Sequence, residues 1–409
     1  MDSMSLKVAV IGGGAAGFFA AISCKTHHPA AQVTILEKSD KLLSKVKISG
    51  GGRCNVTHAC FSNSQLVKFY PRGEKQLRRL FNRFTTTDTV DWFESRGVAL
   101  KAEPDNRMFP VTDSSQTIID CLFSEAKRLG VVVRKKSSVT TINKVGDGFQ
   151  LEIAGQPQNF DKVIVASGGS PKLAGFDWLA SLGHEIVSPV PSLFTFNMPG
   201  NPVKELMGLS VPNAQVKVQG TKLVQSGPLL VTHWGMSGPA ILKTSAWGAR
   251  ILHDLDYRFN AQINWLGDQN ENFLRDWFTE NNSGLSKRKI RNKNPFGLPN
   301  RLWEFLLKKI ELNPDQIWES IGKKGLNRLI NVLLNDVYEV KGKTTFKEEF
   351  VTSGGVALGD IDFNTMESRK CPGLYLAGEV MNVDGVTGGF NFQAAWSSGY
   401  VAGRLSKAS

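Results

Sequence analysis

Apolar and polar residues follow three successive patterns along this chain of 409 residues. In the first pattern, residues 6–11 and 32–37 are nearly continuous apolar runs, which is typical of strands buried on both faces of a parallel sheet. Further elements of this region are predicted as helices at residues 74–96 and 115–129, and as strands at residues 131–134, 150–153 and 162–169. Strands that alternate with helices indicate an α/β fold class.

The second pattern begins after a change of composition at residues 188–191. Short alternating segments separated by Gly and Pro predict an antiparallel sheet or small barrel. Its strands are expected at residues 214–218, 222–225, 229–232 and 258–265. Mostly helices are expected next, at residues 271–278, 301–310, 314–321 and 326–334. Asn313 and Pro314 suit the N-cap and the first residue of the third of these helices.

The third pattern returns to the style of the first. Residues 373–379 form an apolar run, and a Gly-rich loop then leads into a predicted helix from about 393 to 405. We therefore expect a discontinuous first domain made of residues 1–190 and 346–409. The insert, residues 191–345, is expected to have a β-barrel-like part over about 191–268 and a mostly helical part over about 269–345.

A glycine-rich turn joins the first apolar run to the segment after it. Gly12-x-Gly14-x-x-Gly17 has the spacing of a dinucleotide fingerprint, in which the first glycine permits the tight turn, the second lets a pyrophosphate approach and the third lets helix and strand pack closely. A helix N-terminus at this point offers free N–H groups to phosphates. The second apolar run ends in Glu37, where an acid binds the ribose hydroxyls. This region predicts binding of an adenine dinucleotide.

The C-terminal pattern favours a flavin over a nicotinamide as that nucleotide. A NAD domain is complete in its first half, whereas FAD proteins often close the site with a late strand whose acid binds the ribityl chain, and Glu379 fits that acid. The helix after Gly388 and Gly389 is expected to direct its N-terminus at the flavin pyrimidine edge and to stabilise negative charge there. The expected architecture is thus a Rossmann-like FAD-binding domain interrupted by the insert.

Two further loops contain small residues that let the backbone lie against a ligand. One is Gly-Gly-Gly-Arg-Cys-Asn at residues 50–55, where the planar fork of Arg53 suits a phosphate or an acidic substrate. The other is Ser167-Gly168-Gly169 at the end of the strand predicted at residues 162–169. For the second loop, an ordinary connection between a strand and a helix remains the alternative.

Composition narrows the expected partners. Hydrophobic residues make up 41% and charged residues 21% of the chain, which is ordinary for a globular protein, and no apolar run is long enough to span a membrane. The formal charge of +12 permits anionic partners, but without a nucleic-acid motif we interpret runs such as residues 287–289 and 323–324 as solvated faces. No signal or transit peptide is evident, and five cysteines without a CxxC suit a reducing compartment. A cytoplasmic protein without nucleic-acid or membrane partners is expected.

Several motifs together resemble one family. These are ISGGGRCNVT (48–57), RMFP (107–110), THWGMSGPA (232–240), VTSGGV (351–356), TMES (365–368) and GLYLAGEVMNVDGVTGGFNFQAA (373–395). They are similar in kind and order to the BaiN/aminoacetone-oxidase-like flavoproteins, also called YhiN-type NAD(P)/FAD-dependent oxidoreductases, and cover nearly the whole chain. The resemblance implies an FAD domain with an inserted barrel and helical part. Asn106, Asn382 and Phe390 depart from the family's usual Gly, Asp and Tyr.

The resemblance also implies a set of cofactor-binding residues that follows the FAD molecule from one end to the other. The residues for the pyrophosphate, the adenosine and the path to the flavin ring are Gly12, Gly14, Ala15, Gly17, Glu37, Lys38, Lys45, Ser49, Gly51, Gly52, Arg53, Cys54, Asn55 and Val139. The residues that close the nucleotide side and hold the ribityl chain and the ring are Ser167, Gly168, Gly378, Glu379, Gly389, Asn391, Phe392 and Gln393.

The expected chemistry is hydride transfer at flavin N5. His233, in a Gly-rich loop, is the candidate proton donor or acceptor, with a structural histidine as the alternative. A redox pair of Cys54 and Cys60 is a further alternative, and no spacing supports a metal site. We expect an NAD(P)H-linked reductase of a small organic acceptor, with NADH or NADPH as a transient reductant. A flavin oxidase acting on an amine or aminoketone, and an FAD-containing RNA-binding or tRNA-modifying protein, remain the alternatives.

Overall fold

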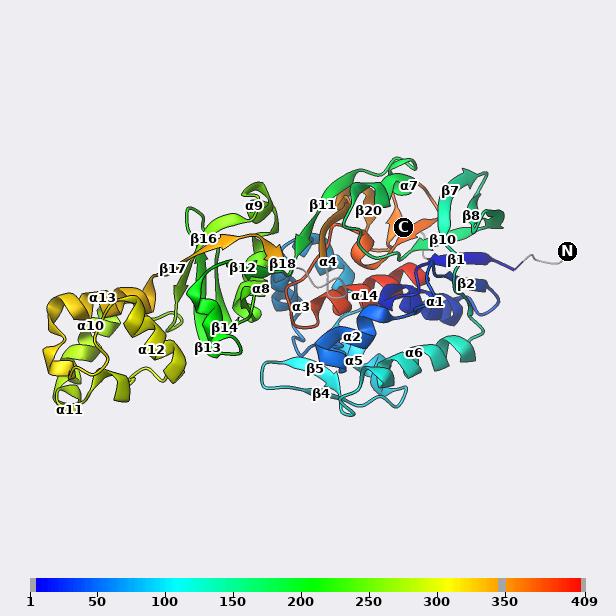
Figure 1. Ribbon diagram of the computed structural model, residues 1–409. Helices are drawn as coiled ribbons and strands as arrows, with labels where there is room; N and C mark the ends of the chain where they lie inside the picture. Colours follow the sequence, from blue (N-terminus) through cyan, green and yellow to red (C-terminus); the bar gives the residue numbers. More distant parts are fainter. Residues whose placement is uncertain (1–4, 345–350, 406–409) are drawn as a thin grey trace. The chain divides into compact units, whose positions relative to one another are not determined.

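The computed structural model describes residues 5–344 and 351–405, apart from the side chains of residues 282 and 283. The chain forms two compact units, drawn as ribbons in Figure 1. The first unit combines Met1–Ser192 with Lys347–Ser409, and the second is Leu193–Phe346. The domain boundary expected at residues 190–191 falls within a strand of the first unit, and that at 345–346 lies outside the described residues.

A seven-stranded sheet forms the centre of the first unit. Its five strands from β22 to β6 run parallel, as the continuous apolar runs predict. In spatial order the strands are β20 (Ile361–Asp362), β21 (Glu367–Ser368), β22 (Leu374–Leu376), β10 (Lys162–Val165), β1 (Lys7–Ile11), β2 (Gln32–Leu36) and β6 (Val132–Arg134). The fold class is thus confirmed: segments from both ends of the sequence build one Rossmann-like sheet.

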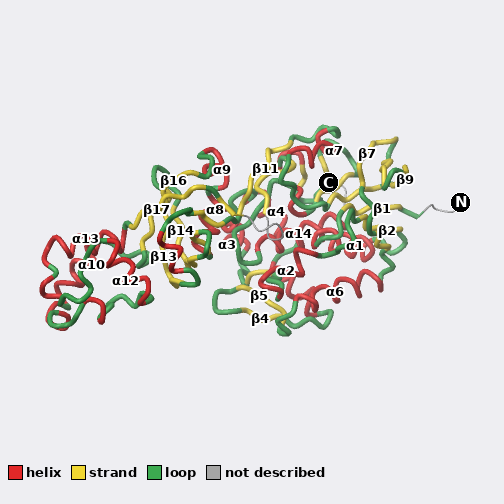
Figure 2. The backbone as a smooth tube through the Cα atoms, viewed as in Figure 1, coloured by secondary structure: helices red, strands yellow, loops and turns green. Residues whose placement is uncertain are grey.

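Two helices from opposite ends of the sequence pack side by side: α1 (Ala15–His27) and α14 (Phe390–Gly403) (Figures 1 and 2). The contact requires glycine, because a Cβ on Gly399 would lie 2.5 Å from the Ala16 carbonyl oxygen and one on Gly403 would lie 2.3 Å from that of Ala20. Both helices are mostly buried. The α1–α14 contact therefore fixes the start of the chain to its end.

Six further helices and three antiparallel sheets complete the part of the first unit that the structure describes. The helices are α2 (Ser44–Gly52), α3 (Asn63–Leu66), α4 (Glu74–Phe81), α5 (Thr86–Glu94), α6 (Ser115–Arg128) and α7 (Asp177–Ala180). The strands form three small antiparallel sheets: β3 (Thr57–His58) with β5 (Arg107–Pro110) and β4 (Leu100–Ala102), β7 (Val139–Val145) with β8 (Gly148–Ile153) and β9 (Gln156–Phe160), and β11 (Ile186–Ser192) with β19 (Val351–Val356).

The second unit contains an antiparallel seven-stranded sheet and a group of helices that share one apolar core. In spatial order the strands are β17 (Asp336–Lys341), β16 (Arg258–Asn264), β13 (Ser210–Val218), β14 (Val224–Val231), β15 (Gly235–Ser237), β12 (Thr195–Asn197) and β18 (Lys343–Thr344). The helices are α8 (Pro239–Trp247), α9 (Ala249–Asp254), α10 (Glu271–Glu280), α11 (Asn282–Leu285), α12 (Asn300–Lys309) and α13 (Gly322–Leu334).

The structure corrects several elements expected from the pattern. The helix expected at residues 314–321 is wrong: only a short 3-10 turn, Trp318–Ser320, forms there. The backbone of this segment instead bonds to a distant one, with Ile290 N donating to Gln316 O and Trp318 N donating to Arg288 O, both at 3.0 Å. Smaller differences are that residues 222–232 belong mainly to one strand, β14, that residues 74–96 form two helices, and that α14 begins at Phe390.

Candidate cofactor site

The loops after four parallel strands carry several of the sequence-predicted cofactor residues. Because the carboxyl ends of parallel strands lie at one edge of a sheet, the loops after β1, β2, β10 and β22 meet there. Gly12 follows β1, Glu37 follows β2, Ser167 follows β10 and Gly378 follows β22. The fold therefore brings the glycine fingerprint, the predicted ribose acid and the predicted ribityl acid to the same edge of the sheet.

The three fingerprint glycines differ in what surrounds them. A Cβ on Gly12, whose φ is +113°, would lie 2.3 Å from the Ala166 carbonyl oxygen, and one on Gly17 would lie 1.9 Å from that of Gly12. A Cβ on Gly14 would meet nothing within 4 Å. Gly14 is also the N-cap of α1, which begins at Ala15 and has neither a side-chain cap nor an acid in its first turn. The turn is thus packed against the protein at Gly12 and Gly17. At Gly14 it leaves free space beside a helix N-terminus without a side-chain cap, as a pyrophosphate site requires.

Glu37 ties the glycine loop to the second strand. Its Oε2 accepts a hydrogen bond from Gly13 N at 2.9 Å, and its Oε1 accepts from Ser39 N at 2.9 Å. The neighbouring Lys38 side chain is exposed. Val139, at the start of β7, lies two residues after Ser137, whose N–H donates to the Glu37 carbonyl oxygen at 2.8 Å. The residues predicted for the adenosine end therefore lie close together.

The triglycine loop at the end of α2 has an open face and a packed one. Gly50, Gly51 and Gly52 have φ values of 59°, 69° and 87°, and a Cβ on Gly51 or Gly52 would meet nothing within 4 Å. On the other face, a Cβ on Gly50 would lie 2.7 Å from the Phe109 ring. The Ser49 carbonyl oxygen accepts from Cys54 N at 2.9 Å and closes the loop. Left-handed glycines thus leave backbone exposed where a ligand can approach.

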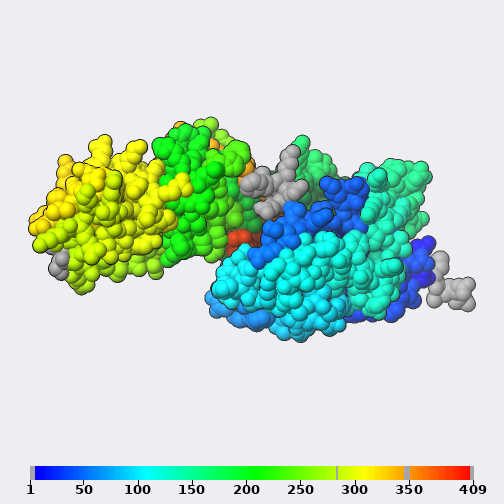
Figure 3. All heavy atoms as spheres, turned by 60° about the horizontal axis from the view of Figure 1, so that its bottom comes forward, coloured from blue at the N-terminus to red at the C-terminus, as the bar shows by residue number. Residues whose placement is uncertain are grey.

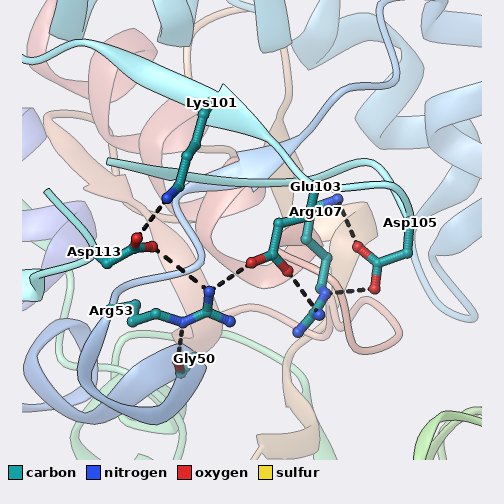
Figure 4. A network of polar contacts seen from close by, with 7 residues as sticks. All are labelled: Gly50, Arg53, Lys101, Glu103, Asp105, Arg107 and Asp113. Carbon is teal, nitrogen blue, oxygen red and sulfur yellow. Dashed lines mark hydrogen bonds and ion pairs between the residues drawn. The ribbon is translucent and has the colours of Figure 1, made fainter. Parts of the chain in front are cut away.

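Arg53 has its guanidinium turned toward carboxylates (Figure 4). Its Nη1 lies 2.5 Å from Glu103 Oε1 and 3.6 Å from Asp113 Oδ1. The guanidinium also lies 4.0 Å from the centre of the Phe109 ring, and its Nε donates to the Gly50 carbonyl oxygen at 3.3 Å. In this arrangement the charge of Arg53 anchors the triglycine loop to β5, and the planar fork predicted to meet a phosphate is bound by the protein.

A pairing between Lys45 and Glu379 joins α2 to the loop after β22. Lys45 Nζ lies 2.6 Å from Glu379 Oε2, and Glu379 Oε1 accepts from Thr352 N at 2.7 Å. Close by, a Cβ on Gly169 would lie 2.9 Å from Glu379 Oε1, whereas one on Gly168 would meet nothing within 4 Å. The predicted ribityl acid is therefore held in place by α2 and β19, next to the loop after β10.

The N-terminus of α14 carries the residues predicted for the flavin ring. Gly389 is its N-cap, and the helix has no side-chain cap hydrogen bond. Asn391 Oδ1 accepts from Gly385 N at 2.8 Å, and the Phe392 ring stacks on Trp396 with centroids 5.6 Å apart. Gln393 is buried. Its Oε1 accepts from Thr57 Oγ1 at 2.6 Å, so the Gln393 amide fixes α14 to β3.

Asn55 links the triglycine loop to this same helix end. With its amide oriented to satisfy both groups, it donates to the Thr57 carbonyl oxygen and accepts from Gly389 N, each at 3.0 Å. Asn55 and Gly389 are thus brought together, although 334 positions separate them in the sequence.

Two features of this region were not singled out from the sequence. Thr352 is buried, and its Oγ1 has no hydrogen-bond partner among the described residues. This oxygen lies close to Gly169, because a Cβ on that glycine would be 2.6 Å from it. Asp384 is fully buried. Burial raises the pKa of its carboxyl, whereas the guanidinium of Arg72 and the hydroxyl of Ser192, both in contact with it, lower that pKa. VTSGGV and the Asp384 loop were visible as motifs, but only the fold shows that they meet.

The remaining candidates are His233, which belongs to the second unit, and the cysteines Cys54 and Cys60 of the first unit. His233 belongs to the second unit, on the turn between β14 and β15, where its exposed ring lies 4.5 Å from that of Trp234. Cys54 is fully buried, and burial raises the pKa of its thiol to about 12. Cys54 and Cys60 are both free thiols. The catalytic role of His233 stays a prediction.

The residues at the sheet edge fit a dinucleotide. An uncapped helix N-terminus, glycine faces that open onto free space and an unpartnered buried hydroxyl beside Glu379 are the groups that a pyrophosphate and a polyol chain would use. Within residues 5–344 and 351–405, no helix combines the length and the apolar character needed to cross a membrane.

Comparison with known proteins places these features in a family. Residues 6–405 match the family described as "HI0933-like protein Rossmann domain". The chain is 30% identical over 401 residues to the ribosomal RNA dihydrouridine synthase of Escherichia coli, covering 96% of this chain and 95% of that protein. It is 27% identical over 418 residues to the 3-dehydro-bile acid delta(4,6)-reductase of Clostridium scindens, covering 97% and 98%.

A solved structure agrees in fold. An E. coli quinol fumarate reductase matches with a TM-score of 0.50 and 14% identity, over 99% of this chain and 70% of that one. The chain therefore belongs to the HI0933-like Rossmann family, the YhiN/BaiN-type FAD-dependent oxidoreductases.

Proposed function

We propose that this flavoprotein reduces a carbon–carbon double bond conjugated to a carbonyl group, and that its acceptor is a uracil base in RNA. The observation that carries the proposal is the full-length similarity to two relatives whose names both describe this kind of reduction. Dihydrouridine is uridine with hydrogen added across the ring double bond next to a carbonyl. A delta(4,6)-reductase of a 3-dehydro bile acid acts on double bonds conjugated to a ketone. An FAD enzyme that donates hydride to such acceptors accounts for both names.

The residues at the sheet edge have distinct tasks in this reaction. FAD, when bound, supplies a hydride from N5 to the acceptor and is reduced in turn by NADH or NADPH. The open face at Gly14 and the N-terminus of α1 bind the pyrophosphate. Glu379, held by Lys45 and by Thr352 N, binds the ribityl hydroxyls. The N-terminus of α14, which has no side-chain cap, would stabilise negative charge on a bound flavin ring.

A proton must reach the acceptor as well as a hydride. Hydride adds to the carbon at the far end of the conjugated system, and a proton adds to the carbon beside the carbonyl, which saturates the double bond. His233, exposed on the turn between β14 and β15, is our candidate for the group that gives this proton through a ring nitrogen.

RNA is the favoured acceptor because the net charge of the chain is +12 and the first relative acts on ribosomal RNA by name. This proposal departs from the absence of nucleic-acid partners expected from motifs alone. A small enone is the second candidate, and the bile-acid reductase is the observation that favours it.

Two anaerobic half-reactions test the proposal. First, the holoenzyme is mixed with NADH or NADPH, and bleaching of the flavin band is expected with at least one of them. Second, the reduced enzyme is mixed with ribosomal RNA transcripts or with a panel of enones, and return of the flavin band is followed. Recovery with RNA, together with a mass gain of two hydrogens on a uridine, supports the RNA acceptor. Recovery with enones alone supports the second candidate.

The oxidase alternative makes the opposite prediction in the same apparatus. An amine or aminoketone would bleach the flavin band, both nicotinamides would fail, and oxygen would restore the band rapidly. That combination of results would overturn the proposed reductase.

A further inference from the structure

A cluster of cations in the second unit lies outside the residues predicted to bind the cofactor. Five of the seven residues from 287 to 293 are basic, and all five are exposed: Lys287, Arg288, Lys289, Arg291 and Lys293. We call residues 287–293 the basic segment. It lies in the helical part of the second unit, whose surface is drawn in yellow and yellow-green in Figure 3.

The backbone of the basic segment is fixed by contacts that leave its cations outside. Ile290 is fully buried, its N–H donates to the Gln316 carbonyl oxygen at 3.0 Å, and its carbonyl oxygen accepts from Trp303 Nε1 at 3.0 Å. The carbonyl oxygen of Arg288 accepts from Trp318 N at 3.0 Å. A single apolar residue thus anchors the segment, and the charged side chains project from a defined scaffold rather than from a loose loop.

The cations are only partly neutralised by nearby acids. Asp315 lies 3.3 Å from Lys289 and 3.6 Å from Arg291. Among the residues that the structure describes, no carboxylate is within ion-pair distance of Lys287, Arg288 or Lys293, as the contacts in this part of the chain show. Residues 314–319 bond to the basic segment and its neighbour Ser286 through the backbone, and we call them the facing segment. Besides Asp315, the facing segment contains one further acid, Glu319. Positive charge therefore remains in excess on this surface.

The helix that follows the facing segment adds two more cations in an unfavourable place. Lys323 and Lys324 are exposed in the first turn of α13, and that turn contains no acid. Cations at a helix N-terminus oppose the helix dipole, which favours negative charge there. The whole second unit shares this excess, since residues 193–346 hold 20 Lys and Arg against 13 Asp and Glu, a net charge of +7.

We propose that the basic segment binds the phosphate backbone of the RNA whose uracil is reduced. The inference rests on the proposed function and adds the surface that holds the substrate. Lysine and arginine that project from a fixed backbone suit phosphodiesters, which supply most of the affinity of proteins for nucleic acid. A membrane surface fits less well, because residues 287–293 expose no large apolar side chain: Ile290, their only one, is buried.

The test compares two triple variants of the full-length holoenzyme with equal changes of charge. The first carries K287E, R288E and K293E. The control carries K75E, K217E and K222E, which replace exposed lysines outside the basic segment. Thermal unfolding and the flavin spectrum confirm that both are folded and loaded. Binding of a fluorescent, uridine-containing single-stranded RNA is then measured by anisotropy across a series of salt concentrations.

Loss of three phosphate contacts lowers the slope of log Kd against log salt by about 2, since each contact contributes roughly 0.7 for single strands. We expect that change, with a Kd raised roughly tenfold or more at low salt, in the first variant and a much smaller one in the control. Equal effects in both variants, an unchanged slope in the first, or tighter binding to phosphatidylserine vesicles than to RNA would overturn the assignment.

The two proposals fail in different ways. If the parent enzyme binds and reduces RNA while the first variant does so equally well, the basic segment is wrong and the RNA acceptor stands. If the parent enzyme binds no RNA but reduces enones, the RNA acceptor and this surface both fall.

Discussion

Lys45 Nζ and Glu379 Oε2 lie 2.6 Å apart, although 334 positions separate the two residues in the sequence. The Lys45 side chain is half exposed and that of Glu379 is mostly buried. Because Glu379 also accepts from Thr352 N, its carboxylate joins α2, β19 and the loop after β22. Three segments that are distant in the sequence are thus aligned at the predicted ribityl position.

Replacement of Lys45 by methionine is expected to weaken FAD binding more than folding. A half-exposed ion pair contributes about 0.2–1 kcal/mol to stability. The charge-assisted hydrogen bond between the cofactor and Glu379, which Lys45 holds in place, is worth about 1.5–3 kcal/mol. FAD affinity, measured by titrating the apoprotein and following flavin fluorescence, should fall roughly tenfold or more. Lys47→Met, two residues further along α2 and also exposed, is the matched control. Equal losses in the two variants would contradict the role given to Lys45.

The glycine fingerprint offers a second matched pair. A methyl group at Gly17 meets the Gly12 carbonyl oxygen at 1.9 Å, so that Gly17→Ala should destabilise the apoprotein by about 1–3 kcal/mol or more. A methyl group at Gly14 meets nothing within 4 Å, and the φ of Gly14 is −95°, which alanine adopts. Gly14→Ala should therefore unfold like the parent in urea but bind FAD more weakly. FAD binding by Gly14→Ala that equals that of the parent would contradict the role given to the open space at Gly14.

A third pair tests the closure of the chain around α14. Gln393 Oε1 accepts from Thr57 Oγ1 at 2.6 Å, and both residues are buried. Thr57→Val and Gln393→Met should each lower the free energy of unfolding by about 1–3 kcal/mol, because each leaves a buried polar partner unpaired. The double variant should cost less than the sum, by about 0.5 kcal/mol or more. Strict additivity in urea unfolding would show that the contact is not formed.

The pH dependence of stability should reflect the burial of Cys54. Its pKa rises from 9.0 to about 12 in the folded protein, so the unfolded chain loses this proton first as pH increases. Stability is therefore fully present below about pH 8 and declines above it, by up to about 1.4 kcal/mol per pH unit for one such thiol. Cys54→Ala should show a shallower decline between pH 8 and 10.

The same residue also bears on the redox-pair alternative. A thiol that stays protonated at pH 8 is a poor nucleophile. Folded protein should leave Cys54 unmodified by iodoacetamide at that pH, as peptide mass mapping would show. Fast alkylation of Cys54, or the same pH slope in Cys54→Ala as in the parent, would count against its enclosure.

The sequence predicts those features of the fold that depend on a short run of residues or on a single residue type. The apolar runs at residues 6–11 and 32–37 form neighbouring parallel strands. Strands of a parallel sheet are buried on both faces, and a continuous apolar run is the pattern that such burial needs. Asn106, where the family was expected to have glycine, has a φ of 64°, a left-handed conformation that asparagine tolerates well among residues with a side chain. Such positions can be interpreted from the sequence because the constraint lies in the residue itself.

Long-range contacts explain where the sequence misleads. Asn313 and Pro314 have the residue types of a helix start, yet the backbone beyond them bonds to the basic segment instead. Spacing also does not reveal that Glu103 reaches Arg53 from the β4–β5 hairpin, and the part of Arg53 in cofactor binding stays a prediction. Neither partner can be identified from spacing along the chain, because each is brought by tertiary structure. The cofactor roles of the predicted site residues remain predictions for the binding experiments above.

We propose that the two ends of the sequence together bind a single FAD at the carboxyl edge of one sheet. Calorimetric titration of the refolded apoprotein with FAD measures this binding and its stoichiometry. We expect a yellow protein that binds one FAD per chain at micromolar concentration or below. A well-folded, colourless protein that takes up no FAD at micromolar concentrations would contradict it.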